Sequence, residues 1–80
     1  MDIVREIHDF VVAEFASERS ELDANENLLA QGIIDSLGIL KLVAFLEERF
    51  GVEAADDDLV PENFGSIEQL RAYVERKRSG

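Results

Sequence analysis

The chain has 80 residues without cysteine, and its 18 acidic residues against 8 basic ones give a formal charge of −10. This length suffices for a single domain over residues 1–80 whose thin core disfavours a large catalytic pocket, and the absence of cysteine excludes a disulfide framework. Because the negative charge repels phosphate groups, we expect the protein to bind basic protein surfaces and neither nucleic acid nor membranes. No segment is typical of a secretion signal or a membrane span, so we expect a cytoplasmic protein. We also expect it to be a monomer.

The first predicted element is a helix over residues 2–17, whose apolar residues recur at helical spacing. They are Ile3, Val4, Ile7, Phe10, Val11 and Phe15. His8, the only histidine, lies beside this apolar stripe and is expected to be half-exposed. Residues 18–35 lose the helical spacing and gather turn-forming residues, so they predict a long loop held on the core by its leucines and isoleucines. A loop of this length is usually functional or disordered, and its apolar content argues against disorder.

A second helix is predicted over residues 36–50, S-L-G-I-L-K-L-V-A-F-L-E-E-R-F, and is followed by Gly51, which suits a left-handed position after a helix. One face of this helix is expected to hold Leu40, Val43, Leu46 and Phe50. Leu42 and Phe45 are expected to point elsewhere. A helix that is apolar over most of its girth is either central in the bundle or keeps part of its surface for a partner or a ligand.

The rest of the chain predicts one short and one long helix. Residues 52–64 are acidic and contain the only proline, and they are interpreted as a loop with one short helical turn near residues 61–64. Ser66 and Gln69 form a capping-box pattern at the start of a last helix over residues 66–77. The sequence therefore predicts an all-α fold, a small helical bundle of three main helices plus one short helix.

The stretch G-I-I-D-S-L, residues 32–37, lies where the long loop gives way to the second helix. Aspartate is a preferred N-cap, so Asp35 is expected to accept a hydrogen bond from the first turn. Ser36 then occupies the first helical position, with a hydroxyl that the cap does not need. Because helix N-termini favour phosphate, Ser36 is a candidate site of modification.

Other chemistries are less well supported by the sequence. A nucleophilic Ser36 would need a base, but His8 is the only histidine and no G-x-S-x-G motif surrounds the serine. Asp and Asn at positions 23, 25 and 27 imitate the start of a calcium loop, but the positions that require glycine and glutamate hold Leu28 and Ile34. The acidic residues 56–58 are interpreted as a solvated turn, so we predict no metal site.

With its surroundings, the D-S-L motif resembles that of the acyl, aminoacyl and peptidyl carrier proteins, which bear 4′-phosphopantetheine on the serine. The likeness extends over nearly the full chain, including E-E-x-F-G at the end of the second helix and F-x-S-I before the last. The resemblance implies that Ser36 is the covalent attachment residue, modified by a separate phosphopantetheinyl transferase that uses coenzyme A. It also implies that Asp35 helps to position the metal-bound donor phosphate and that Leu37 contacts the transferase and later partners.

The resemblance further implies a carrier that is not itself an enzyme and that holds acyl or aminoacyl groups as thioesters on the arm. Its partners would be adenylating or acyl-loading enzymes and condensing or tailoring enzymes. They are expected to contact the second helix through Leu37, Lys41, Glu47 and Glu48. The cargo is expected to lie against an apolar surface made by Leu42, Phe45, Val60 and Phe64.

Departures from the family pattern bear on the pathway. Fatty-acid carriers usually have acidic residues on the first turns of the second helix, where this chain has Gly38 and Lys41. The leading interpretation is therefore a stand-alone carrier of a specialised-metabolite pathway, of polyketide or nonribosomal peptide type. A carrier for D-alanine or for fatty-acid synthesis is the alternative, since G-x-x-D-S also resembles D-alanyl carriers. An alternative of another class is an unmodified acidic helical module that binds a basic protein.

Overall fold

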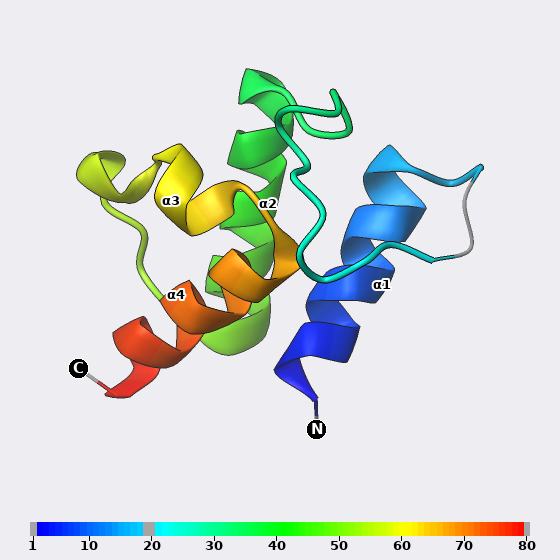
Figure 1. Ribbon diagram of the computed structural model, residues 1–80. Coiled ribbons are helices and arrows are strands. Elements are labelled where there is room, and N and C mark those ends of the chain that lie inside the picture. The colour runs from blue at the N-terminus through cyan, green and yellow to red at the C-terminus, as the bar shows by residue number, and fades with distance from the viewer. Residues whose placement is uncertain (1, 19–20, 80) are drawn as a thin grey trace.

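The computed structural model describes residues 2–18 and 21–79, and all secondary structure in these segments is helical (Figure 1). Helix α1 spans Ile3–Phe15, α2 Ser36–Phe50, α3 Pro61–Phe64 and α4 Ile67–Ser79, and a 3₁₀ turn, η1, covers Asp56–Asp58. The predicted all-α bundle of three main helices plus one short helix is thus confirmed.

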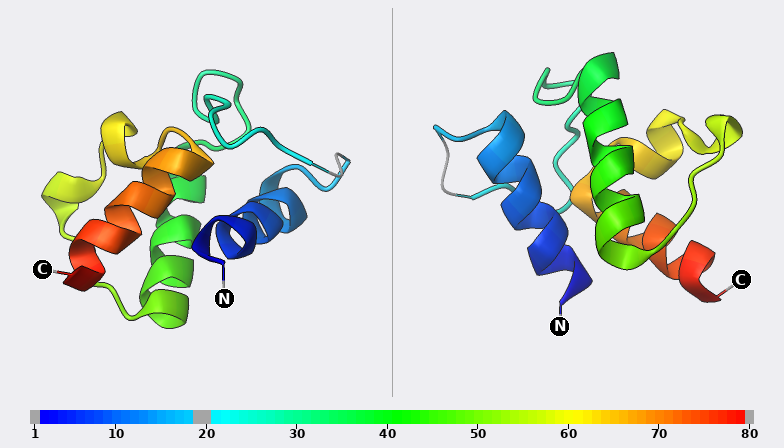
Figure 2. Two further views of the ribbon diagram at one scale, coloured as in Figure 1. Left: turned by 60° about the horizontal axis from the view of Figure 1, so that its bottom comes forward. Right: turned by 180° about the vertical axis from the view of Figure 1, so that it is seen from behind.

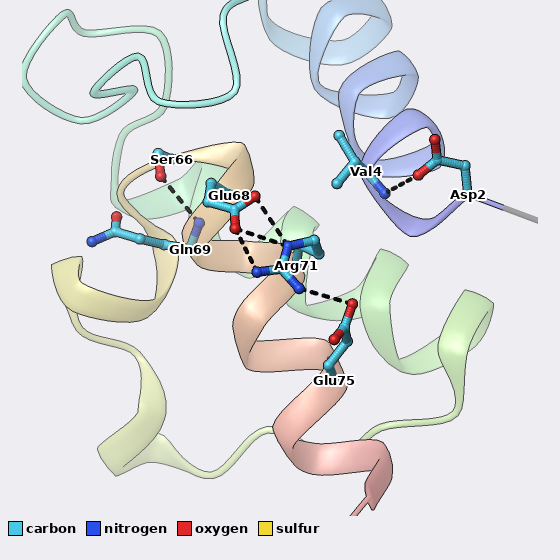
Figure 3. A network of polar contacts seen from close by, with 7 residues as sticks. All are labelled: Asp2, Val4, Ser66, Glu68, Gln69, Arg71 and Glu75. Atoms are coloured by element: carbon cyan, nitrogen blue, oxygen red, sulfur yellow. Dashed lines mark hydrogen bonds and ion pairs between the residues drawn. The ribbon is translucent and has the colours of Figure 1, made fainter.

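The helix boundaries follow from local capping interactions. Asp2 Oδ1 accepts a hydrogen bond from Val4 N at 3.0 Å, and Ser66 Oγ accepts one from Gln69 N at 3.1 Å, as the sequence predicts for the start of α4 (Figure 3). Helix α2 begins and ends at the predicted residues, and Gly51 beyond it adopts a left-handed backbone with φ of 70°. Helix α1 ends at residue 15 instead of 17, and η1 was not predicted because its acidic sequence carries no helical periodicity.

Helix α2 lies at the centre of the fold, with α1 on one side and η1 and α3 on the other (Figure 1 and Figure 2). Helices α1 and α2 run in opposite directions, and the described parts of the long loop pass over the end of the bundle where α2 begins. The beginning of α1 and the end of α4 both lie toward the opposite end of the molecule, well separated from each other. The start of α2 is therefore remote from the first residues of α1 and the last residues of α4.

The core is formed by apolar side chains from every α-helix and from the long loop. Its buried members include Ile7, Val11, Leu42, Leu46, Phe64, Ile67, Leu70, Tyr73 and Val74 of the helices and Leu22, Leu28 and Ile34 of the loop. Burying one such side chain stabilises a fold by about 1.5–3 kcal/mol. The three buried loop residues confirm the prediction that leucines and isoleucines hold the loop on the core.

The orientation of α2 corrects a sequence-based expectation. Gly38, Leu42 and Leu46 are four residues apart and face the core, and both leucines are completely buried. Leu40, which the sequence placed on one face with Leu46, is instead 57% exposed. The prediction was wrong because positions 40 and 46 lie about 120° apart around a helix of 3.6 residues per turn, whereas positions 42 and 46 lie only about 40° apart.

His8 is also placed differently from the expectation of a half-exposed side chain. It is buried, and its Nε2 accepts a hydrogen bond from Leu22 N at 3.0 Å across the start of the loop. Because Nε2 accepts, the ring proton lies on Nδ1, which donates to Asp9 Oδ1 at 3.0 Å. The loop covers His8 and uses it as an anchor, which periodicity within α1 could not reveal.

The acidic connector between α2 and α4 is fastened to α4 through Asp58. Asp58 Oδ2 accepts hydrogen bonds from the Tyr73 hydroxyl at 2.9 Å and from Lys77 Nζ at 3.4 Å. The bond from Tyr73, followed by that from Ala55 N, holds the pKa of Asp58 below its ordinary value. Burial and then the bond to Asp58 raise the pKa of Tyr73 to about 12. Only Asp56 and Asp57 of the acidic run are therefore solvated as predicted.

Candidate functional site

The segment before α2 is turned into position by its backbone. Gly32 has a left-handed φ of 73°, and Ile33 N and Ile34 N both donate to Leu28 O, at 2.9 and 3.2 Å. Ile34 is the last loop residue before the capping Asp35, and its buried side chain holds this residue on the core. This arrangement directs the chain into α2 at Asp35.

Asp35 caps α2 as predicted. Its backbone is extended, and its Oδ1 accepts a hydrogen bond from Gly38 N at 2.8 Å. Ser36 is the first residue of the helix and is exposed, and its hydroxyl makes no hydrogen bond with another residue that the structure describes. The cap uses the aspartate and leaves the serine hydroxyl available at the positive end of the helix dipole.

The backbone of Gly38 is approached closely from two sides. A Cβ atom at this position would lie 3.0 Å from both Ile34 Cγ2 and Phe15 Cε1, and 3.4 Å from Asp35 Oδ1. Position 38 is therefore buried and offers no side chain to a partner. A side chain at this position would have to displace Ile34 or Phe15 by a few tenths of an ångström.

The outer face of α2 gathers the other residues that the sequence singled out. Leu37 is 71% exposed, and Lys41, Glu47 and Glu48 are exposed on successive turns beyond it. Leu40 lies on the same face and was missed, although its spacing of three residues from Leu37 was a usable signal. This face, residues 37, 40, 41, 44, 47 and 48, is called the outer face of α2 below; it is apolar near Ser36 and acidic at its far end.

The expected cargo surface is not formed. Leu42 and Phe64 are completely buried in the core, so neither offers surface to a ligand. Phe45 is directed toward α1, where its ring stacks on that of Phe10 with centroids 4.1 Å apart. Val60, the fourth residue of the expected surface, is half-buried, as is Phe45. The expectation was thus wrong for Leu42 and Phe64, because the small core needs both side chains for its own packing.

The alternative chemistries find no support among the described residues. The Nε2 atom of His8 is occupied by Leu22 N, so it is not available as a base for Ser36. Asp23 Oδ1 accepts from Asn25 N at 2.8 Å and thus stabilises a turn. Residues 2–18 and 21–79 contain no group of three His, Asp or Glu side chains that would hold a metal ion. None of the helices described has the length and apolar content needed to cross a membrane.

Comparison with known proteins gives consistent matches. The family model described as phosphopantetheine attachment site matches residues 5–74. An acyl carrier protein of Zymomonas mobilis is 31% identical over 78 residues, which cover 98% of this chain and 97% of that protein. A D-alanyl carrier protein of Abiotrophia defectiva is 32% identical over 59 residues, covering 74% of this chain and 72% of that protein. The solved structure of KstB-PCP(apo) superposes with a TM-score of 0.70 at 46% identity, covering 86% of this chain and 78% of that one.

Proposed function

Because this chain belongs to the phosphopantetheine-dependent acyl and peptidyl carrier proteins, we propose that Ser36 is the residue to which its 4′-phosphopantetheine is attached. The observation that carries this assignment is an exposed serine at the first position of α2, beside an aspartate that already caps the helix. When bound, the arm supplies the thiol that holds an acyl or aminoacyl group, which this chain without cysteine cannot provide.

The residues around Ser36 suit such a group. The first N–H groups of a helix lack partners within the helix, and Asp35 takes up that of Gly38. The remaining N–H groups of the first turn and the dipole of α2 favour the phosphate of the arm. Asp35 is exposed at this end and would place its carboxylate near the metal-bound donor phosphate during attachment.

We assign the docking of partner enzymes to the outer face of α2. Leu37 would enter an apolar contact beside the arm, and Glu47 and Glu48 would face a basic patch further along the helix. Complementary charge of this kind raises the rate of encounter and selects partners more than it raises affinity, and it weakens with salt. Lys41 would select against partners whose basic patch reaches the middle of the helix.

A specialised-metabolite pathway is the proposed context, with adenylating or acyl-loading and condensing or tailoring enzymes as partners. The buried Gly38 and the exposed Lys41 support it, because the first turns of α2 present no acidic side chain. Similarity to a D-alanyl carrier favours D-alanine as the second candidate cargo. We also propose that the chain has no catalytic activity of its own, since the hydrogen bond from Leu22 N occupies His8.

The test is the intact mass of the protein before and after incubation with coenzyme A, magnesium and a broad-specificity phosphopantetheinyl transferase. The wild type is expected to gain one phosphopantetheinyl group, or to contain it as purified, whereas Ser36→Ala is not modified. Ser17→Ala, which removes another exposed serine, is the matched control and is expected to behave as the wild type. Modification of Ser36→Ala, or no modification of the wild type, would overturn the assignment and favour the acidic interaction module.

A further inference from the structure

The first turn of α2 is packed from the side of α1 by one aromatic ring. Phe15 is the last residue of α1, and its Cε1 atom is one of the two nearest neighbours of a Cβ at Gly38. The amide of Gly38 is also the donor to the Asp35 cap. The ring of Phe15 therefore lies against the residue on which the cap depends.

Phe15 is itself held by further aromatic contacts. Its ring meets Phe10 edge-on with centroids 6.1 Å apart, Phe10 stacks on Phe45, and Phe45 meets Phe50 edge-on at 5.9 Å. The four half-buried rings form a continuous row between α1 and α2. Phe15 is at the end of the row nearest Ser36, and Phe50 is at the other end of α2. Edge-on and stacked pairs of this kind restrict the orientation of each ring.

Resting on the proposed attachment at Ser36, we infer that Phe15 and Gly38 are positioning residues, which hold the first turn of α2 so that Asp35 and Ser36 keep one orientation for the transferase. The first turn of a helix frays readily when little packs against it. Without the ring, space opens beside Gly38, its N–H parts from Asp35 more often, and the serine hydroxyl and the carboxylate lose their fixed relation. With a larger residue at position 38, the ring, Ile34 or the carboxylate must move.

The mechanism predicts which kinetic constant changes. Of the outer face of α2 only Leu37 belongs to the first turn, and the other residues lie beyond it. Changes at Phe15 or Gly38 therefore leave most of the proposed docking surface, and with it the affinity for the transferase, unaltered. Misplacement of reacting groups by about 1 Å can cost about a hundredfold in rate. In the variants the first turn would be misplaced for only part of the time, so the loss is smaller. We expect kcat of attachment to fall by about tenfold and KM to change by less than about twofold.

The experiment compares Phe15→Leu with Phe50→Leu, which makes the same change at the other end of the aromatic row, and includes Gly38→Ala as a second variant. Steady-state attachment kinetics are measured together with circular dichroism and hydrogen exchange of the Gly38 amide. We expect lower kcat and faster Gly38 exchange for Phe15→Leu, lower kcat for Gly38→Ala, and neither effect for Phe50→Leu. Equal kinetics and equal exchange in the two leucine variants would overturn the inference and leave Phe15 with a purely structural role.

The outcome is separable from that of the proposed function. If the wild type is not modified at Ser36, the assignment of the attachment site fails, and hydrogen exchange of the Gly38 amide then decides the positioning role without the transferase. Faster exchange of this amide in Phe15→Leu than in Phe50→Leu would support the inference that the Phe15 ring stabilises the first turn of α2, and equal exchange would refute it.

Discussion

Asp35 caps α2, and we propose that it also takes part in attachment of the arm; two substitutions separate these two roles. Asp35→Ala removes the acceptor of the Gly38 N–H and the negative charge at the start of α2. Loss of an N-cap costs about 1 kcal/mol, and loss of the charge next to the helix dipole costs about 0.3–0.5 kcal/mol at an exposed site. Asp35→Asn keeps an equally good cap and loses only the second contribution.

The two variants are therefore expected to differ strongly in stability, whereas attachment of phosphopantetheine is impaired in both. At about 4–8 °C per kcal/mol for a domain of this size, Asp35→Ala lowers the Tm by about 5–12 °C and Asp35→Asn by about 1–4 °C. Thermal and urea unfolding followed by circular dichroism measure this order. In attachment of phosphopantetheine both variants are expected to be impaired, because both lack the carboxylate that would face the metal-bound phosphate. Asp35→Ala is expected to be impaired more, because it also loses the cap that holds the first turn of α2. Attachment to Asp35→Asn at the wild-type rate would refute the charge role, and an Asp35→Ala protein as stable as the wild type would refute the cap.

Two further predictions concern Tyr73 and the left-handed glycines. Tyr73 is the only tyrosine and the chain lacks tryptophan, so an absorbance titration reports this group by itself, with a midpoint expected near its raised pKa of about 12. Because the folded pKa is raised, the neutral phenol stabilises the fold fully below the ordinary value near 10, and this stabilisation is lost as the pH rises through about 12. Asp58→Asn should lower the midpoint while leaving it above about 10, since burial is the larger cause; a wild-type midpoint near 10 would contradict the contact. Gly51→Ala and Gly32→Ala place a Cβ in open space at φ of 70° and 73°, so the only cost is backbone strain. Each substitution should lower the free energy of unfolding, measured with urea, by about 1 kcal/mol. Unchanged unfolding midpoints would refute this account.

The sequence predicts best where structure is decided by near neighbours. The bounds of α2 were predicted because Asp35 and Gly51 act within a few residues of the helix ends. The short α3 follows from Pro61, whose ring suits the first turn of a helix. The end of α1 was less well predicted because no capping residue marks it, and the chain leaves the helix at Ala16, which is buried in the core.

Features decided by contacts distant in sequence could not be predicted. The exposure of Leu40 and the burial of Leu42 depend on how α2 is rotated against the other helices. His8 is buried by Leu22, fourteen residues later, and local periodicity contains no sign of that contact. The sequence suggested that Phe45 contacts a cargo, but its ring stacks on Phe10, because the apolar faces of α1 and α2 pack against each other.

The positions of the candidate site residues could be predicted more completely than the core around them, and their roles stay predictions. Ser36, Asp35 and Leu37 are consecutive, and Lys41, Glu47 and Glu48 follow on the same helix at spacings that share a face. One correctly placed helix is enough to bring such residues together. Leu40 belongs with them on the exposed side and extends the apolar part of that face.

The position of the chain ends bears on how such a carrier can be linked to other proteins. The beginning of α1 and the end of α4 lie toward the end of the molecule away from the start of α2 (Figure 1), where Ser36 is the first residue. A linker joined to either end would leave the serine and the outer face of α2 pointing outward. The same fold would therefore serve as a free carrier or as one tethered by a linker, and the surface that we propose for partner enzymes would be equally accessible in both.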